Sequence, residues 1–393
     1  MKLHSLFYLI GFLYCSFTGQ SQSYSLSEAA EISIITVGPG QNLYDKFGHT
    51  AFRVVDPANQ IDWAYNYGTY DFNTPNFYTK FAQGKLLYEL SVWPFDGFMN
   101  LYKQENRWVK EQRLNLTTNE KTALFRYLQN NALPENKKYL YDFFYDNCAT
   151  KIRDILVEVL NNVTYTDDFV KDPMTFRQLI QKNVPANSWG SLGMDVAIGA
   201  VTDQQATAWE HQFLPQYVFE AASVATINHN GKMEPLVKET ETLFQNNPTQ
   251  NSTSFFVSPL FVFGLLALLI LFITWRDYKN VQRSRYLDGT IFLVTGAIGV
   301  ILLLLWFATD HSSTANNYNV LWAFPLSLFF AFGICKKVPK SWMQRYVVLL
   351  LLMLLLIGLH AITGVQGFAI GLLPLFIALF IRYMYVYSYL KKS

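Results

Sequence analysis

Hydrophobic and polar residues alternate along short stretches in the first part of the chain. Residues 49–55 and 61–68 place apolar side chains at every second position, and the turn-forming residues 56–59 separate them. A period of two is typical of β-strands with one buried face, so these stretches predict a hairpin whose first strand begins at His49. A β-branched run at residues 31–37, followed by glycine and proline, predicts a further strand.

Other stretches have the helical period. A capping box of Thr117 and Glu120 opens a helix that we expect to end at Asn131. After Cys148, apolar side chains recur on one helical face, at Ile152, Ile155, Leu156, Val159 and Leu160. Further strands are expected at residues 85–93, 108–116 and 139–145, and helices at residues 77–83, 95–106, 174–183 and 203–225. This mixture of strands and helices predicts an α+β domain.

The last third of the chain is dominated by apolar runs. Five of them are long enough, or nearly so, to cross a bilayer: residues 255–274, 290–308, 320–334, 346–363 and 368–387. Lys and Arg concentrate in the loops after the first and third runs and are absent from residues 310–319 and 364–367. Because positive charge marks the cytoplasmic side, the sequence predicts an extracytoplasmic α+β domain and a cytoplasmic C-terminus.

The N-terminus has the order of a secretory signal. Lys2 and His4 precede an apolar run at residues 6–17 and small or polar residues at 18–20. We therefore expect a signal peptide at residues 1–20, an extracytoplasmic domain at 21–245, a linker at 246–254 and a transmembrane domain at 255–390. The linker is rich in Asn, Thr, Ser and Gln, a composition typical of flexible connectors.

Composition agrees with this division and narrows the possible chemistry. The 393 residues are 51% hydrophobic and 15% charged, which is too apolar for one soluble domain and too polar for a protein wholly within the membrane. A net charge of +2 indicates no nucleic-acid partner. The histidines are scattered, cysteines do not pair, and no glycine-rich phosphate loop is present, so the sequence predicts neither a metal site nor a cofactor.

Cys148 is the candidate nucleophile. It lies at the first turn of its predicted helix, where Asp146 or Asn147 can act as the cap. The free N–H groups and dipole of a helix N-terminus stabilise a thiolate. With the signal peptide removed, Cys148 is the only thiol expected outside the cytoplasm, which favours a functional role. The alternative is a cysteine that only fills core space.

A catalytic cysteine needs a nearby base, and the predicted extracytoplasmic domain has three histidines. His49 is the best candidate because it heads a strand, whereas solvated positions explain His211 on a helix and His229 in a turn. The alternative for His49 is a polar residue at a strand end. A third side chain should orient its ring, and Asn66, Asp71 and Asp62 are candidates on or beside the neighbouring strand.

Further residues are candidates for auxiliary roles. The Cys148 N–H with a side chain such as Tyr44 or Asn147 would form an oxyanion hole. Lys151 and Arg153, one turn from the thiol, are candidate contacts for a lipid headgroup, with a solvated helix face as the alternative.

Two more features bear on contact with the membrane. Asp310 and His311 end the second apolar run and could hold the domain or a headgroup, with an ordinary loop as the equal alternative. A stripe of four side chains either enters the membrane interface or lies in the core. Its members are Phe95, Phe98, Met99 and Tyr102.

Several stretches carry a family resemblance. Residues 44–53, 65–72, 84–86 and 146–154 resemble the DUF4105 (Lnb) family, and landmarks at 189–195, 213–215 and 310–325 extend the likeness over nearly the whole chain. A histidine strand ahead of an Asn-Cys helix is similar to circularly permuted papain-like proteins such as lecithin:retinol acyltransferase and the NlpC/P60-related hydrolases.

The resemblance implies a circularly permuted papain-like domain of NlpC/P60 type followed by a five-helix transmembrane bundle. It also implies a bacterial inner-membrane acyltransferase. Cys148 would take a fatty acyl group from the diacylglyceryl group of a lipoprotein, or from a phospholipid, as a thioester. His49 would remove the thiol proton and then deprotonate the acceptor amine, expected to be the lipoprotein N-terminus.

Two other functions stay open at this point. The domain could be a cysteine peptidase or amidase acting on cell-wall peptides, although one span would suffice to anchor such an enzyme. It could also be a non-enzymatic membrane scaffold, in which case Cys148 would be dispensable.

Overall fold

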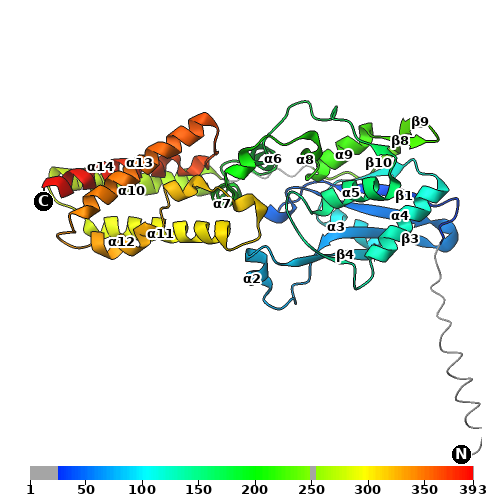
Figure 1. Ribbon diagram of the computed structural model, residues 1–393, viewed down its shortest axis with the longest axis horizontal. Coiled ribbons are helices and arrows are strands. Elements are labelled where there is room, and N and C mark those ends of the chain that lie inside the picture. Colours follow the sequence, from blue (N-terminus) through cyan, green and yellow to red (C-terminus); the bar gives the residue numbers. More distant parts are fainter. Residues whose placement is uncertain (1–24, 248–253, 393) are drawn as a thin grey trace, which may run out of the picture.

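A computed structural model describes residues 25–247 and 254–392. The expected signal peptide and most of the expected linker lie outside these residues. The described chain forms a sheet-based domain and a bundle of long helices, which meet end to end (Figure 1). A mixed α and β domain followed by five apolar helices is the predicted fold class, and it is confirmed.

The domain is built on a seven-stranded sheet with the order β10-β5-β1-β2-β3-β4-β6, in which every neighbouring pair is antiparallel. The strands are β1 (Glu31–Val37), β2 (His49–Asp56), β3 (Ile61–Thr69), β4 (Leu87–Pro94), β5 (Val109–Leu114), β6 (Lys138–Leu140) and β10 (Val237–Phe244). The predicted hairpin is β2 and β3, and it lies at the centre of the sheet. His49 pairs with Val37, so it occupies the end of a central strand.

Helices cover both faces of the sheet, although the alternation of the strand residues predicts only one buried face. Phe52 and Val54 share a core with helices α4 (Thr118–Asn131), α5 (Cys148–Leu160) and α9 (Pro215–Val224). Ala51 and Ala64 face the opposite side, where they pack against α3 (Phe95–Gln104). All four members of the aromatic stripe on α3 are buried there, so the stripe belongs to the core.

Smaller elements complete the domain. The helices α2 (Phe77–Ala82), α6 (Phe176–Asn183), α7 (Trp189–Ala197) and α8 (Ala208–His211) lie nearer the bundle than most of the sheet (Figure 1). A second sheet consists of β7 (Val163–Thr164), β8 (Thr226–His229) and β9 (Lys232–Pro235). Its β8–β9 turn has Asn230 and Gly231 at positive φ, as the tight turn predicted there requires.

Two expected elements differ from those observed, and one observed strand was not expected. The strand expected at 139–145 ends at Leu140, because the Asp142 carboxylate accepts hydrogen bonds from the main-chain N–H of Phe144 and Tyr145 and forms a turn. The helix expected at 203–225 is broken, since Pro215 lacks an N–H and begins α9 after α8 has ended. The edge strand β10 was not predicted, because charged side chains obscure its alternation.

The bundle contains α10 (Pro259–Lys279), α11 (Arg285–Phe307), α12 (Leu326–Ile334), α13 (Trp342–Thr363) and α14 (Leu373–Lys392). Five segments of the described chain are long and apolar enough to cross a membrane, in agreement with the five predicted runs. The third is composite: its span of Ser312–Ile334 consists of 3-10 turns followed by the nine-residue α12.

A buried polar junction joins the domain to the bundle. Arg177, only 2% exposed, contacts the carboxylates of Asp195 and Asp203, each at 2.9 Å. Segments of the bundle bind the same two aspartates. The Asn319 amide, between α11 and α12, donates to the main-chain oxygen of Asp195 at 3.0 Å, and the Gly367 N–H, between α13 and α14, donates to the Asp203 carboxylate at 2.9 Å. Residues of the bundle therefore complete the hydrogen bonds of buried polar groups in the domain.

Candidate active site

The thiol of Cys148 stands at the N-terminus of α5 because the preceding residue caps that helix. Asn147 has an extended backbone, and its Oδ1 accepts hydrogen bonds from the N–H groups of Ala149 and Thr150 at 2.7 and 3.0 Å. Thr150 returns a bond to the Asn147 N–H and completes a capping box. Asn147 is thus the cap, and the Cys148 N–H has no partner among the described residues.

His49 reaches this helix tip from the first position of β2. Gly48 precedes it with φ +81°, and a Cβ at that position would lie 2.7 Å from the carbonyl oxygen of Val37, so only glycine fits this turn. Thr50 fixes the strand to the helix, since its hydroxyl donates to the main-chain oxygen of Cys148 at 2.9 Å. His49 and Cys148 therefore line the same cavity, close enough for each to shift the pKa of the other.

Asn66 is the third member of the arrangement. The Nε2–H of His49 donates to Asn66 Oδ1 at 2.5 Å, which leaves Nδ1 of the ring for Cys148. Asn66 is 9% exposed and comes from β3, immediately before a bulge where that strand loses register with β4. Gly68 lies in the bulge with φ +90°, and a Cβ there would be 3.4 Å from Cys148 Cβ. The bulge therefore lets β3 pass close to the thiol.

The two reactive groups shift each other's ionisation. Burial raises the pKa of the Cys148 thiol, but the His49 imidazolium and hydrogen bonds from His49 and Thr50 outweigh it, so that pKa is lowered. Burial lowers the pKa of His49, whereas the Cys148 thiolate and hydrogen bonds to Cys148 and Asn66 raise it by more. This arrangement favours a thiolate and imidazolium pair.

Alkylation of Cys148 by iodoacetamide is expected to show this pair directly. A thiol with a lowered pKa stays ionised as the pH falls below ~8.5, the value for a free thiol, so alkylation should remain fast there. In His49→Ala the burial remains and the imidazolium is lost, so the pH profile should move to higher pH. Alkylation for a fixed time at each pH, followed by mass spectrometry, measures the pH profiles of the parent chain and of His49→Ala.

His229→Ala is the matched control, because His229 is bound by Glu120 and Glu234 in the β8–β9 region. It should leave the profile of Cys148 unchanged. Equal profiles for the parent chain and His49→Ala would remove His49 as the base.

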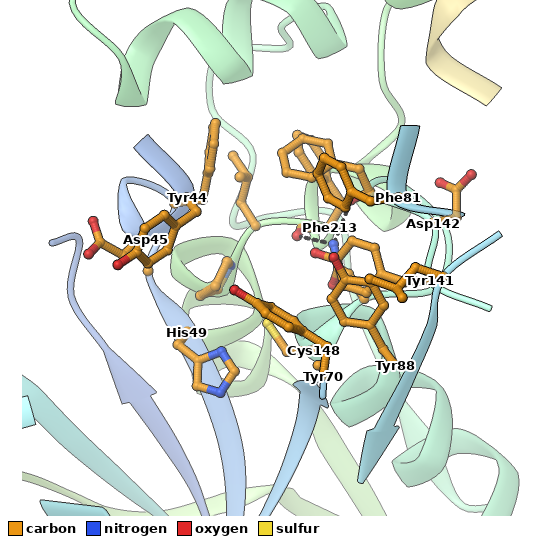
Figure 2. A pocket seen from close by; sticks show the side chains of 18 of the residues that line it. Tyr44, Asp45, His49, Tyr70, Phe81, Tyr88, Tyr141, Asp142, Cys148 and Phe213 are labelled. Atoms are coloured by element: carbon orange, nitrogen blue, oxygen red, sulfur yellow. Dashed lines mark hydrogen bonds between the residues drawn. The ribbon is translucent and has the colours of Figure 1, made fainter. Parts of the chain in front are cut away.

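A cavity of about 470 Å³ opens at the thiol. Figure 2 shows Cys148 and His49 at its floor, with Tyr70, Tyr88 and Tyr141 beside them. The volume is within the usual range for small-molecule sites. Asp310, His311, Ser312 and Ser313 line it as well, and they belong to the loop after α11. Its wall therefore comes from both halves of the chain.

Comparison with protein families gives two matches. Residues 18–182 match the family model of the Lnb N-terminal periplasmic domain, and residues 250–393 match that of the Lnb transmembrane domain. The chain belongs to the Lnb family. No curated protein and no solved structure matches it. As a member of the Lnb family with both of its domains, it is a multi-pass membrane protein with a periplasmic N-terminal domain.

In this Lnb protein the predicted auxiliary residues Tyr44, Asp71 and Asn147 make contacts other than the predicted ones. Tyr44 lines the cavity but is exposed, and its hydroxyl accepts from Asn42. Asp71 follows β3 and accepts hydrogen bonds from Asn73, with no contact to His49. Asn147 donates both amide hydrogens to the main-chain oxygens of Phe143 and Phe213, so an oxyanion role for Asn147 is not supported.

Of Lys151, Arg153 and His311, which were predicted to contact a lipid headgroup, only His311 lines the cavity. Lys151 pairs with Asp146 at 2.6 Å, and Arg153 is buried with its guanidinium over the Trp209 ring at 3.9 Å. Neither Lys151 nor Arg153 lines the cavity, because their own partners hold them elsewhere. His311 does line the cavity, and its Nε2 contacts the main-chain oxygen of Phe81 at 3.2 Å.

The other two histidines of the domain were expected to be solvated, but neither is. His211 is fully buried, with Nδ1 bonded to the main-chain oxygen of Thr207 at 2.7 Å, and His229 is held between two glutamates. Glutamate contacts account for His229, whereas in His211 the buried Nε2 has no hydrogen-bond partner among the described residues.

Sequence reasoning missed Tyr88 and Tyr141 of the cavity. The ring of Tyr141 stacks on that of Tyr88 with centroids 4.2 Å apart. Burial, and then the negative charge of Cys148, raises the pKa of Tyr141 well above its ordinary value, so its hydroxyl stays protonated as a donor. The signal available was aromatic clustering on either side of the Asn-Cys motif, but only the folded loop places Tyr141 at the thiol.

Proposed function

We propose that this Lnb protein is a thiol acyltransferase that moves a fatty acyl chain from a membrane lipid group to an amine. The observation that carries this is the contact of Cys148 with His49 and of His49 with Asn66, at a cavity walled partly by the transmembrane half. A peptidase would not need a site built against its own spans.

The two steps follow from the arrangement. The Cys148 thiolate attacks the ester carbonyl carbon, a C–S bond forms, the ester C–O bond breaks, and the His49 imidazolium gives its proton to the departing alcohol. The amine nitrogen then attacks the thioester carbonyl, His49 takes the amine proton, and the C–S bond breaks to restore the thiolate. Asn66 keeps the ring turned toward the sulfur in both steps.

We assign the oxyanion donors to the unpaired Cys148 N–H and the Tyr141 hydroxyl. Both carry hydrogen in the resting site, and Tyr141 lines the same cavity as Cys148 (Figure 2). Removing one such donor costs about 10²-fold or more in kcat.

The acyl donor we propose is the diacylglyceryl group of a lipoprotein, and the acceptor is the amine of its N-terminus. Family membership supports a lipoprotein-modifying enzyme. We place the protein in the bacterial inner membrane with its C-terminus in the cytoplasm, because Lys and Arg concentrate in the loops on that side. The histidine strand precedes the cysteine helix, the order of a circularly permuted papain-like domain.

The test is transfer by the full-length protein in phospholipid vesicles that contain a diacylated lipopeptide with an isotope-labelled acyl chain. We expect the label to move from ester to amide linkage on the N-terminal nitrogen, with a lyso product, as read by mass spectrometry. A hydroxylamine-sensitive acyl group on Cys148 should appear when the lipopeptide amine is blocked.

Tyr141→Phe should lower the transfer rate by about 10²-fold while leaving iodoacetamide labelling of Cys148 unchanged. Tyr44→Phe is its control, since the Tyr44 hydroxyl is exposed and only accepts from Asn42. Release of free fatty acid without amide formation would replace the transferase by a hydrolase, and cleavage of peptide bonds would support the peptidase alternative.

A further inference from the structure

Aromatic side chains gather on the short helix α2 and the turn before it. The rings of Tyr70, Phe72, Phe77, Tyr78 and Phe81 contact one another, and we call them the α2 patch. Phe72 is 67% exposed, Tyr78 79% and Phe81 53%. Soluble surfaces rarely expose aromatic rings in such a contiguous group, so the patch indicates a binding surface.

Hydrogen bonds fix the α2 patch to the end of the bundle. The N–H of Asp310 donates to the main-chain oxygen of Gln83 at 2.8 Å, and His311 contacts that of Phe81. Asp310 is the third residue after Phe307, the last residue of α11. Because α11 is a membrane-spanning helix, its end marks the membrane surface, and α2 lies at that level (Figure 1).

Other aromatic residues mark the same level. Trp306 and Phe307 stack at the end of α11, and Phe307 is exposed. Phe255 and Phe256 are exposed just before α10. Aromatic rings at the ends of spans are typical of the interface between lipid and water. The α2 patch therefore continues an aromatic belt, which identifies its occupant as lipid and not a protein.

The patch also reaches the cavity. Tyr70 and Phe81 line the cavity together with His311, which contacts the main-chain oxygen of Phe81, while Phe72 and Tyr78 remain outside it. A side of the cavity thus begins at the level of the membrane surface, where acyl chains are available.

We propose that the α2 patch enters the outer surface of the bilayer and forms the mouth through which a lipid acyl group reaches Cys148. The entry route rests on the proposed acyl transfer, whereas the membrane contact does not. The two statements therefore have separate tests.

Membrane contact is tested by fluorescence. The full chain, with its native cysteines replaced by serine, receives a single cysteine by Tyr78→Cys or Trp93→Cys and is labelled with NBD. Trp93 is the matched control because it is exposed on β4, which starts beside α2 and ends away from the bundle. In phosphatidylethanolamine and phosphatidylglycerol vesicles with doxyl lipids, position 78 should be quenched and position 93 should not. Equal quenching would overturn the proposal.

Entry is tested by Phe72→Ser combined with Tyr78→Ser. Loss of two interfacial rings should slow transfer from a membrane-borne donor by roughly tenfold or more, while iodoacetamide labelling of Cys148 stays unchanged. Trp93→Ser should change neither. Full-rate transfer by the double variant would overturn the entry route. Absence of transfer in the parent chain would refute the proposed function, and quenching at position 78 would still decide the membrane contact.

Discussion

Replacing Cys148 with serine is expected to lower acyl transfer by about 10⁴-fold or more. The site is built around a thiolate whose charge the His49 imidazolium and hydrogen bonds from Thr50 stabilise. A serine hydroxyl is not ionised by such a pair, so the covalent step loses its nucleophile while the cavity stays intact. Amide product formed in vesicles, measured by mass spectrometry, gives the rate.

Cys335→Ser is the control for this substitution. Cys335 follows α12, and its thiol points to the main-chain oxygen of Arg285, a contact that a hydroxyl can keep. It should transfer at the rate of the parent chain. Cellular function retained by Cys148→Ser would instead support the non-enzymatic scaffold.

The second large effect is expected at the junction of the two halves. Arg177→Leu leaves the buried carboxylates of Asp195 and Asp203 without their cation, and breaking a buried ion pair in this way costs about 3–5 kcal/mol. The melting temperature of the full chain should therefore fall by about 5 °C. Thermal unfolding in detergent, followed by intrinsic fluorescence, measures the shift.

Lys238→Met is the comparison, because Lys238 forms an exposed ion pair with Glu31, and exposed pairs contribute about 0–1 kcal/mol. It should change the melting temperature little. A similar small change for Arg177→Leu would mean that the junction is held by the main-chain hydrogen bonds alone.

The sequence predicted the elements that hold the thiol and the imidazole because their signals are local. Residues 49–55 and 61–68 alternate cleanly and form β2 and β3, and the apolar stripe after Cys148 forms the buried face of α5. His49 and Cys148 were paired by chemistry and family resemblance. Their contact depends on where β2 crosses α5, which no local pattern specifies.

The side-chain positions that the sequence did not predict depend on tertiary contacts. The third residue was one of three candidates until strand register showed that Asn66 meets His49. Lys151 and Arg153 have the composition of a headgroup site, but Asp146 and Trp209 hold them away from it. The stripe on α3 was left open between the membrane interface and the core, and it lies in the core; the exposed aromatic side chains of α2 were not predicted, because the aromatic content of a segment does not indicate which side of the sheet has a covering layer.

The cavity wall supplied by Asp310, His311, Ser312 and Ser313 limits how this chain can be divided. A fragment that stopped after Phe244 would carry the sulfur, the imidazole and the amide, yet its cavity would be open on one side and it would lack the bundle groups, Asn319 and Gly367, that hydrogen-bond to Asp195 and Asp203. The two halves therefore make a single working unit. We expect substitutions in the loop after α11 to alter which substrates are accepted, even though that loop contributes neither nucleophile nor base.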